Sequence, residues 1–206
     1  QSTDENGLAI LPVPTYTDKE YTIQTIYDGF VVYEEEVSLN FMNRFRPWIS
    51  SSTINRYNLK LNVKDTLGLA PGKDPQPILK SQKMMAKNSI KAEKIEEGYY
   101  EFNDLYSSDY QITLSFKSWE QTESISLNDD KTIDMIFPAE FTLETIILDQ
   151  IGNPINIADL TLERQGKKIK GEIEEDGIAE LMAPPGNYFL TISYDDETIA
   201  AQQVII

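Results

Sequence analysis

The sequence predicts an all-β protein built of small antiparallel β-sandwiches in tandem, with the first sandwich incomplete. Three observations support this fold class. Short runs rich in Ile, Val, Leu, Thr, Tyr and Phe alternate apolar and polar residues, as in residues 57–63, which is typical of strands with one buried face. Gly, Pro, Asn and Asp interrupt these runs at short intervals. The third observation is an internal repeat that organises the whole chain.

The clearest repeated motif is an acidic turn that is closed by glycine and followed by an apolar strand. It reads DENGLAIL at 4–11, EEDGIAEL at 174–181 and, more weakly, IEEGYYEF at 95–102. A tyrosine lies beyond the glycine of each copy, and a further strand begins 15 or 16 residues beyond each tyrosine. The three tyrosines are Tyr21, Tyr110 and Tyr188. We expect them to pack in the core with the hydroxyl bonded to the backbone, as in a tyrosine corner.

The front half of the repeat occurs only twice. YNLKLNVKDTLG at 57–68 aligns with FTLETIILDQIG at 141–152, and both strands run into an Asp-x-x-Gly turn. PILKS at 77–81 then corresponds to ADLTLER at 158–164. The alignment predicts that three pairs of residues are equivalent: Asp65 with Asp149, Gly98 with Gly177, and Tyr110 with Tyr188.

These offsets divide the chain into four parts. They are the carboxy-terminal half of a sandwich repeat (1–40), an aromatic-rich connector (41–53) and two full repeats (54–138 and 139–206). Residues 80–98 contain many helix formers, but their place in the repeat predicts strands and loop. We therefore expect little helix anywhere in the chain.

Residues 141–206 carry a pattern that resembles the carboxypeptidase-regulatory-like domains, which are relatives of the transthyretin-like and collagen-adhesin B-type repeats. The matching residues are Asp149, Gly152, Pro154, Ile155, Ala158, Asp176, Gly177, Ala179, Pro184, Pro185, Gly186 and Tyr188. Residues 3–39 resemble the second half of the pattern, and residues 57–137 resemble it more loosely. The resemblance implies seven-stranded Ig-like or prealbumin-like sandwiches that serve as non-catalytic modules of secreted or surface proteins. The Lys–Asn crosslink of collagen-adhesin repeats is not carried over, because no matching Lys, Glu and Asn set is found.

The charge of the chain limits its partners. It has 18 basic and 34 acidic residues and no histidine, which gives a net charge of −16. Binding of phosphate backbones requires clustered Lys and Arg, so we expect no nucleic-acid partner. No apolar run approaches the ~18–20 residues of a membrane span, so we expect no membrane insertion in this segment.

The composition also argues against catalysis. Without His or Cys, the familiar nucleophile–base pairs are missing, and we assign no catalytic residue and no cofactor. Paired carboxylates can hydrolyse glycosides, but here the acidic residues cluster in predicted turns. Calcium remains an alternative, because acidic turns offer the oxygen ligands that this cation prefers. The candidate ligands are Asp4, Asp176, Asp195 and Asp196. None follows the spacing of a dedicated calcium loop, and an acidic hairpin turn is the simpler interpretation.

Aromatic residues supply the remaining candidate sites. Phe41, Phe45 and Trp48 lie in the connector, whose composition is unlike that of a free linker. We expect these three residues to pack between modules or against a partner. Trp48 and Trp119, helped by Tyr99 and Tyr100, offer an alternative role in stacking on sugar rings.

The sequence thus predicts a non-enzymatic structural module of a cell-surface or secreted protein, acting as a rigid spacer or an assembly unit. Its expected partners are other β-sandwich modules of the same or neighbouring chains. The alternative is a carbohydrate-binding accessory module of a larger extracellular enzyme, with a glycan as partner. The start at Gln1 within a repeat favours a processed or excised segment. The missing strands are then expected from upstream sequence, from the neighbouring repeat, or from a second molecule.

Overall fold

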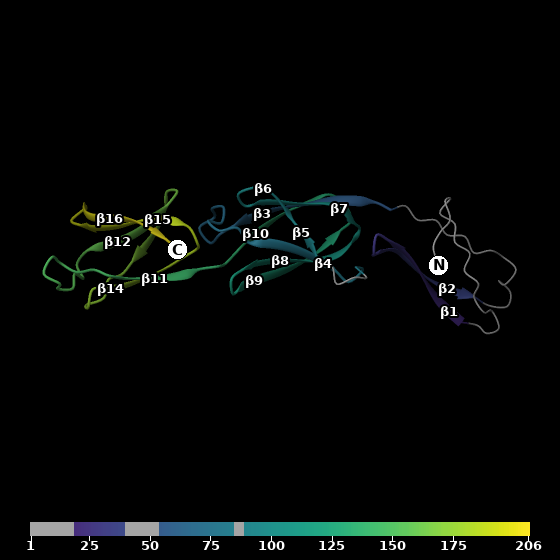
Figure 1. Cartoon of the computed structure of the whole chain (residues 1–206), viewed down its shortest axis with the longest axis horizontal. Helices are drawn as coiled ribbons and strands as arrows, with labels where there is room; N and C mark the ends of the chain where they lie inside the picture. The colour runs from purple at the N-terminus through teal and green to yellow at the C-terminus, as the bar shows by residue number, and fades with distance from the viewer. Residues whose placement is uncertain (1–18, 40–53, 85–88) are drawn as a thin grey trace. The chain divides into compact units, whose positions relative to one another are not determined.

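A computed structural model of the chain describes residues 19–39, 54–84 and 89–206 (Figure 1). The regular elements of these residues are all β-strands, which confirms the predicted all-β class. The chain divides into two compact units, one of residues 1–55 with 82–88 and one of residues 56–81 with 89–206. The predicted boundaries at 40, 53 and 138 are not tested by this division and remain predictions.

The first unit contains one long hairpin, formed by β1 (Lys19–Tyr27) and β2 (Phe30–Leu39). Asp28 and Gly29 make the tight turn, with φ values of 51° and 72°. Positive φ at both central residues suits the right-handed twist of the two strands. In the same unit, the N–H of Val31 donates to the carbonyl of Lys83 at 3.0 Å.

We call strands β3 to β10 the second repeat. They are β3 (Arg56–Lys64), β4 (Gln76–Ser81), β5 (Ile90–Lys91), β6 (Glu93–Glu96), β7 (Tyr99–Tyr106), β8 (Ser108–Phe116), β9 (Trp119–Leu127) and β10 (Lys131–Ile136). They form two four-stranded sheets, with orders β10-β3-β7-β6 and β5-β4-β8-β9. Alternate residues of β3 and β8 are buried, as expected for two sheets that share one core.

We call strands β11 to β16 the third repeat. They are β11 (Phe141–Ile146), β12 (Asp159–Arg164), β13 (Lys167–Gly171), β14 (Ile178–Ala183), β15 (Asn187–Tyr194) and β16 (Glu197–Ile205). β11 and β14 form one sheet, and the other has the order β13-β12-β15-β16. The two sheets of each repeat lie as two layers in Figure 1. The core of the third repeat contains Leu160, Leu162, Leu181 and Tyr188.

The expected equivalences between the two repeats are confirmed by matching hydrogen bonds. The Asp65 N–H donates to the carbonyl of Leu69 at 2.8 Å, and the Asp149 N–H donates to that of Asn153 at 2.8 Å. Gly98 and Gly177 have φ values of 76° and 80°. An added Cβ would lie 2.6 Å from the carbonyl oxygen of Val63 at Gly98 and of Ile147 at Gly177, so both positions require glycine.

The predicted tyrosine corners are also present. The hydroxyl of Tyr110 donates to the carbonyl of Tyr106 at 2.8 Å, and that of Tyr188 donates to the carbonyl of Pro184 at 2.7 Å. Tyr110 and Tyr188 are fully buried, whereas Tyr21 is half-buried.

The three hairpins share their register. Tyr21 pairs with Val37, Tyr110 with Ile125, and Tyr188 with Val204. The first and third hairpins also share a bulge four residues beyond the tyrosine. Residues 19–39 therefore form a hairpin with the register of those in the two full repeats, and the assignment of residues 1–40 to half a repeat remains a prediction.

Two further details concern the strands of the second repeat. The described part of residues 80–98 forms the end of β4, β5 and β6, so the prediction of strands there is confirmed. The strand pairs are antiparallel, as expected, with one exception among the described strands, because β10 runs parallel to β3. Periodicity cannot reveal this, since a strand with one buried face shows the same alternation in either direction.

Candidate functional site

The acidic residues of the described chain do not gather into a metal centre. Within residues 19–39, 54–84 and 89–206, no group of three or more acidic side chains is placed to hold a metal ion. Asp176 closes its own turn, where its Oδ1 accepts from the N–H of Ile178 at 3.1 Å. Asp195 and Asp196 form a different turn, between β15 and β16, with φ values of 47° and 64°. Asp4 lies outside the described residues, and the calcium hypothesis remains untested.

The predicted aromatic sites are only partly visible. Phe41, Phe45 and Trp48 lie outside the described residues. Trp119 is half-buried at the start of β9, and Tyr99 is exposed, whereas Tyr100 is buried. Burial, together with the neighbouring Asp74 carboxylate, raises the pKa of Tyr100. Tyr100 therefore faces the core, where a sugar ring cannot stack on it.

The structure instead draws attention to the turn after β3. In this turn, Oδ1 of Asp65 accepts hydrogen bonds from the N–H groups of Leu67 at 2.9 Å and Leu69 at 3.0 Å. The N–H of Gly68 donates to the carbonyl of Asp65 at 2.9 Å. One carboxylate oxygen therefore closes the turn, and the other, Oδ2, is left for a different partner.

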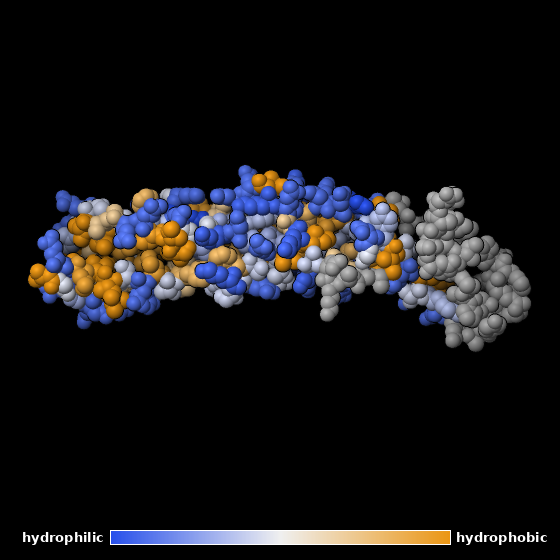
Figure 2. All heavy atoms as spheres, viewed as in Figure 1, coloured by the Kyte–Doolittle hydropathy of each residue, from blue (hydrophilic) through white to orange (hydrophobic). Residues whose placement is uncertain are grey.

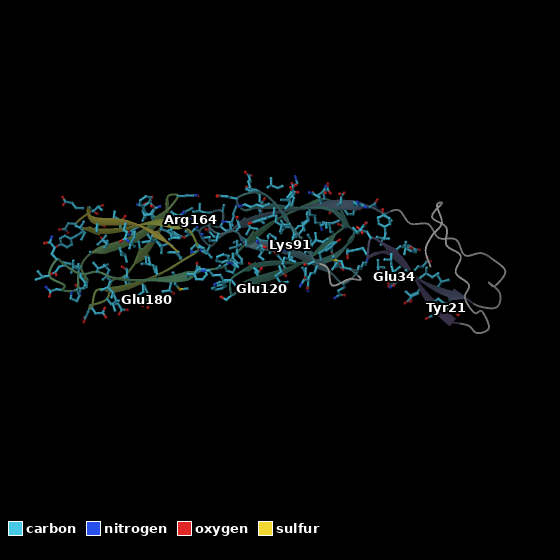
Figure 3. The ribbon with its side chains drawn as sticks, in the orientation of Figure 1. Tyr21, Glu34, Lys91, Glu120, Arg164 and Glu180 are labelled. Carbon is cyan, nitrogen blue, oxygen red and sulfur yellow. The ribbon has the colours of Figure 1, made fainter. Side chains whose placement is uncertain are left out.

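That partner is Arg164, which lies at the end of β12. Along this strand Leu160 and Leu162 are buried, so the period of two turns the Arg164 side chain inward as well. Nη1 of Arg164 donates to Oδ2 of Asp65 at 2.7 Å and to the carbonyl of Pro185 at 3.1 Å. Figure 3 shows Arg164 where the third repeat meets the second.

Two further contacts hold the guanidinium in place. Nη2 of Arg164 donates to the carbonyl of Ala70, so the group binds both a carboxylate and a carbonyl of the second repeat. Its carbon lies 5.7 Å from the centre of the Tyr188 ring. Cations are attracted to the face of an aromatic ring at such distances. The tyrosine of this corner thus also contacts the arginine that binds the second repeat.

The ion pair is buried on both sides. The exposed fractions of the side chains are 6% for Arg164 and 2% for Asp65. A buried charge that loses its partner is strongly destabilising, because water cannot replace that partner. Loss of either partner would therefore leave the other charge buried and unpaired where the two repeats meet.

The backbones of the two repeats also approach closely. A Cβ added at Gly72 would lie 2.3 Å from the carbonyl oxygen of Pro185, so the residue there must be glycine. Leu67, at the tip of the Asp65 turn, packs against the core cluster of the third repeat. We call Asp65, Leu67, Gly72, Arg164 and Pro185 the joint.

The joint is not a feature of every repeat. Arg164 corresponds to Ser81 of the second repeat, and Gly186 corresponds to Ser108. Ser81 and Ser108 share a hydrogen bond of 2.7 Å between their hydroxyl oxygens. The equivalent of Asp65, Asp149, is half-buried, and its Oδ2 accepts from the side chain of Asn153 at 3.0 Å. The arginine is therefore specific to the contact between the second and third repeats.

Sequence reasoning identified Asp65 as a turn residue but missed its pairing with Arg164. A signal was present, since Arg164 continues the inward positions of Leu160 and Leu162. A charged residue at an inward strand position needs a partner when it is buried. The sequence does not say which of many acidic residues that partner is.

Comparison with known proteins gives only distant likenesses. No protein-family model matches the sequence, and neither does any curated protein sequence. Among solved structures, the chain is similar to the Bacillus anthracis TIE protein, at 17% identity over 99% of this chain and 41% of that chain, with a TM-score of 0.39. The chain thus spans about two fifths of the TIE protein's length.

Two pilins are similar at the same level. GBS52, the minor pilin of Streptococcus agalactiae, is 12% identical over 73% of this chain and 90% of that chain, with a TM-score of 0.34. BcpA, the major pilin subunit of Bacillus cereus, is 14% identical over 92% and 81%, with a TM-score of 0.31. Likenesses this weak carry no argument about function. In the part of the chain that the structure describes, no helix has the length and apolar character needed to cross a membrane.

Proposed function

We propose that the protein is a non-enzymatic structural module of a cell-surface or secreted protein, in which joined β-sandwiches act as a rigid spacer or assembly unit. The buried pair of Arg164 and Asp65 is the observation that carries this proposal. Neighbouring domains of one chain move relative to each other unless their interface is large or strongly held. A pair that costs about 3–5 kcal/mol to break provides such a hold.

The surface location and the partners of the module belong to the same proposal. They rest on the resemblance of residues 141–206 to modules of secreted and surface proteins and on the composition of the chain. The net charge of −16 keeps such a module soluble. Its proposed partners are other β-sandwich modules. The carbohydrate-binding alternative is favoured by no specific observation, since Tyr100 is buried and Tyr99 and Trp119 differ in exposure.

A distance measurement across the joint tests the spacer proposal. The chain has no cysteine, so Glu123→Cys and Gln203→Cys place two spin labels at exposed positions of β9 and β16 without competing sites. Pulsed electron paramagnetic resonance then reports the spread of distances between the two repeats. We expect a narrow distribution in the wild-type background.

Two matched substitutions give this experiment its control. Asp65→Asn removes the charge that Arg164 needs and should broaden the distribution. Asp149→Asn changes the equivalent turn, whose carboxylate accepts from Ile151 and Asn153 of that same turn, and should leave the distribution narrow. A broad distribution in the wild-type background would reject the rigid spacer.

A further inference from the structure

The tight turn between β8 and β9 carries a lysine where the other two hairpins of this kind carry an aspartate. Lys117, Asp28 and Asp195 each come directly after the first strand of their hairpin, with φ values of 51°, 51° and 47°. Aspartate tolerates this left-handed backbone better than most residues, because its short side chain can bond to the local backbone. A lysine side chain gains nothing from such a turn. The conformation of Lys117 therefore points to a role outside the turn itself.

The Lys117 side chain reaches two aromatic rings that belong to different repeats. Its Nζ lies 4.8 Å from the centre of the Phe141 ring and 5.5 Å from that of Phe116, at which distance a ring face attracts a cation. Phe116 is the last residue of β8, and Phe141 is the first residue of β11. The two rings meet edge to face, with centres 6.3 Å apart and planes at 87°. One ammonium therefore bridges the second and third repeats.

Aromatic contact, and not ion pairing, defines the surroundings of this ammonium. The chain has 34 acidic residues, yet none of the ion pairs among the described residues includes Lys117. Figure 2 shows that hydrophilic residues cover most of the visible face of the second repeat, where charged side chains are ordinarily solvated. Lys117 is exposed as well, but its charged end lies on rings.

The ring of Phe116 is covered more than that of its counterpart. Tyr194 ends the first strand of the hairpin of β15 and β16, as Phe116 ends that of β8 and β9. Tyr194 is 45% exposed, whereas Phe116 is half-buried. The contact with Phe141 therefore accompanies the burial of a hairpin residue that is exposed in the third repeat.

The Lys117 contact and the Arg164 ion pair join different sheets. Asp65 follows β3, in the sheet β10-β3-β7-β6, whereas Lys117 connects β8 and β9, in the sheet β5-β4-β8-β9. In the third repeat Arg164 belongs to β12 and Phe141 to β11, which again lie in different sheets. A single contact between two bodies leaves them free to rock about it, whereas a second contact in another layer opposes that motion.

We propose that Lys117 is a positioning residue of the contact between the second and third repeats. Its ammonium holds the Phe141 ring against Phe116 and restricts movement in the layer that Asp65 and Arg164 do not join. This inference rests on the proposed function as a rigid spacer and adds a second fastening beside the joint. The lysine in the turn is explained by this contact, because aspartate at that place carries the wrong charge for a ring face.

Nuclear magnetic resonance of the whole protein tests the contact itself. Ring currents shift protons that lie over the face of an aromatic ring upfield. We expect the ε-methylene protons of Lys117 to lie upfield of those of Lys60 and Lys168, which pair with glutamates. Phe141→Leu should remove much of this shift. An unshifted Lys117 resonance in the wild type, or a shift that Phe141→Leu leaves unchanged, would overturn the inference.

The pair of spin labels at Glu123→Cys and Gln203→Cys tests the effect on position. Lys117→Asn gives the turn a residue that suits positive φ but removes the cation, so we expect a broader distance distribution than in the wild type. Lys117→Arg keeps a cation over the rings and should restore the wild-type width. Asp195→Asn, at the same place in the turn between β15 and β16, is the matched control and should have no effect.

The two rings supply a further check and separate this inference from the proposed function. Phe141→Leu should broaden the distribution, and Lys117→Asn should add nothing to it, because both act through one contact. A wild-type width in Lys117→Asn, or equal broadening by Lys117→Arg, would overturn the role of Lys117 and leave the rigid spacer intact. A broad distribution in the wild-type background would reject the rigid spacer. Further broadening by Lys117→Asn and its reversal by Lys117→Arg would still support the role of Lys117, and their absence would overturn it.

Discussion

Asp65 performs two tasks with its two carboxylate oxygens. Oδ1 closes the turn after β3, and Oδ2 binds Arg164 of the next repeat. Asp149 performs only the first of these tasks. Hydrogen bonds from the backbone and side chain of Asn153, and from the N–H of Ile151, lower the pKa of Asp149 below its ordinary value. The two aspartates therefore allow turn closure to be separated from ion pairing by experiment.

Asparagine at these two positions should have unequal effects on stability. Asp65→Asn keeps an oxygen for the turn but leaves the Arg164 charge buried without its partner, which should lower the free energy of unfolding by about 3–5 kcal/mol. Asp149→Asn should have a much smaller effect, because its carboxylate accepts from Ile151 and Asn153 of its own turn and leaves no buried arginine unpaired. Adding Arg164→Met to Asp65→Asn should restore much of the loss, since an apolar side chain of similar length can fill the site. Urea denaturation of the single and double variants measures these terms, and simple additivity would contradict the coupling.

Arg164 also shows where sequence reasoning ends. Its inward position follows from the period of β12, and its burial could have been predicted from the sequence. Its partner could not, because Asp65 lies 99 residues away and looks like any other turn residue. Pairing across such a distance depends on how two repeats pack, and no local pattern records this.

At the scale of elements, each tyrosine corner links a hairpin to the residues that lie just before it in the chain. Tyr188 bonds to the carbonyl of Pro184, just before β15, and its ring lies under the Arg164 guanidinium. The sequence predicted this role from three tyrosines at similar offsets. The prediction succeeded because the spacing between the tyrosine and its partner strand is set within one hairpin, and each copy of the repeat keeps that spacing.

Removing one hydroxyl tests the corner. Tyr188→Phe should lower the free energy of unfolding by about 1–3 kcal/mol, because the buried carbonyl of Pro184 loses its donor. Tyr194→Phe, at an exposed position in the same strand, is the matched control and should have little effect. Thermal unfolding or urea denaturation measures both variants. Equal stability of Tyr188→Phe and the wild type would show that the hydrogen bond contributes nothing.

The same corner should respond to alkaline pH. Burial raises the pKa of Tyr188, although the hydrogen bond and charge of Arg164 act in the opposite direction. The folded state therefore holds this proton more strongly than the unfolded state does. The corresponding stability is fully present below about pH 10 and is lost as the pH rises through the raised pKa. Tyr188→Phe should lose less stability than the wild type over this range.

β10 is the element that the sequence described least well. Its parallel pairing with β3 could not be inferred from the alternation of its residues. The repeat alignment ends at the last strand of each back half, so residues 131–136 had no second copy for comparison. Only the sheet order reveals that these residues pair with β3.

At the scale of the whole molecule, the net charge of −16 opposes contact between copies. Mutual repulsion of this kind is screened by salt, with a Debye length of ~10 Å at 0.1 M and ~3 Å at 1 M. Exposed apolar residues such as Ile146, Leu148 and Met182 favour contact, and burial of apolar surface is not weakened by screening. The balance between the two effects should therefore depend on ionic strength.

Self-association should accordingly strengthen as salt is raised, and sedimentation velocity at low and high sodium chloride measures it. If divalent cations act only by screening carboxylates, magnesium will replace calcium at equal concentration. The acidic turns at Asp176 and at Asp195 and Asp196 provide the contrast, because they belong to the candidate calcium ligands. An effect of calcium at micromolar concentration, with magnesium inert, would identify a specific site in place of screening. Asp176→Asn should then abolish the effect if that turn holds the ion, whereas under screening it would change association only through the loss of one charge.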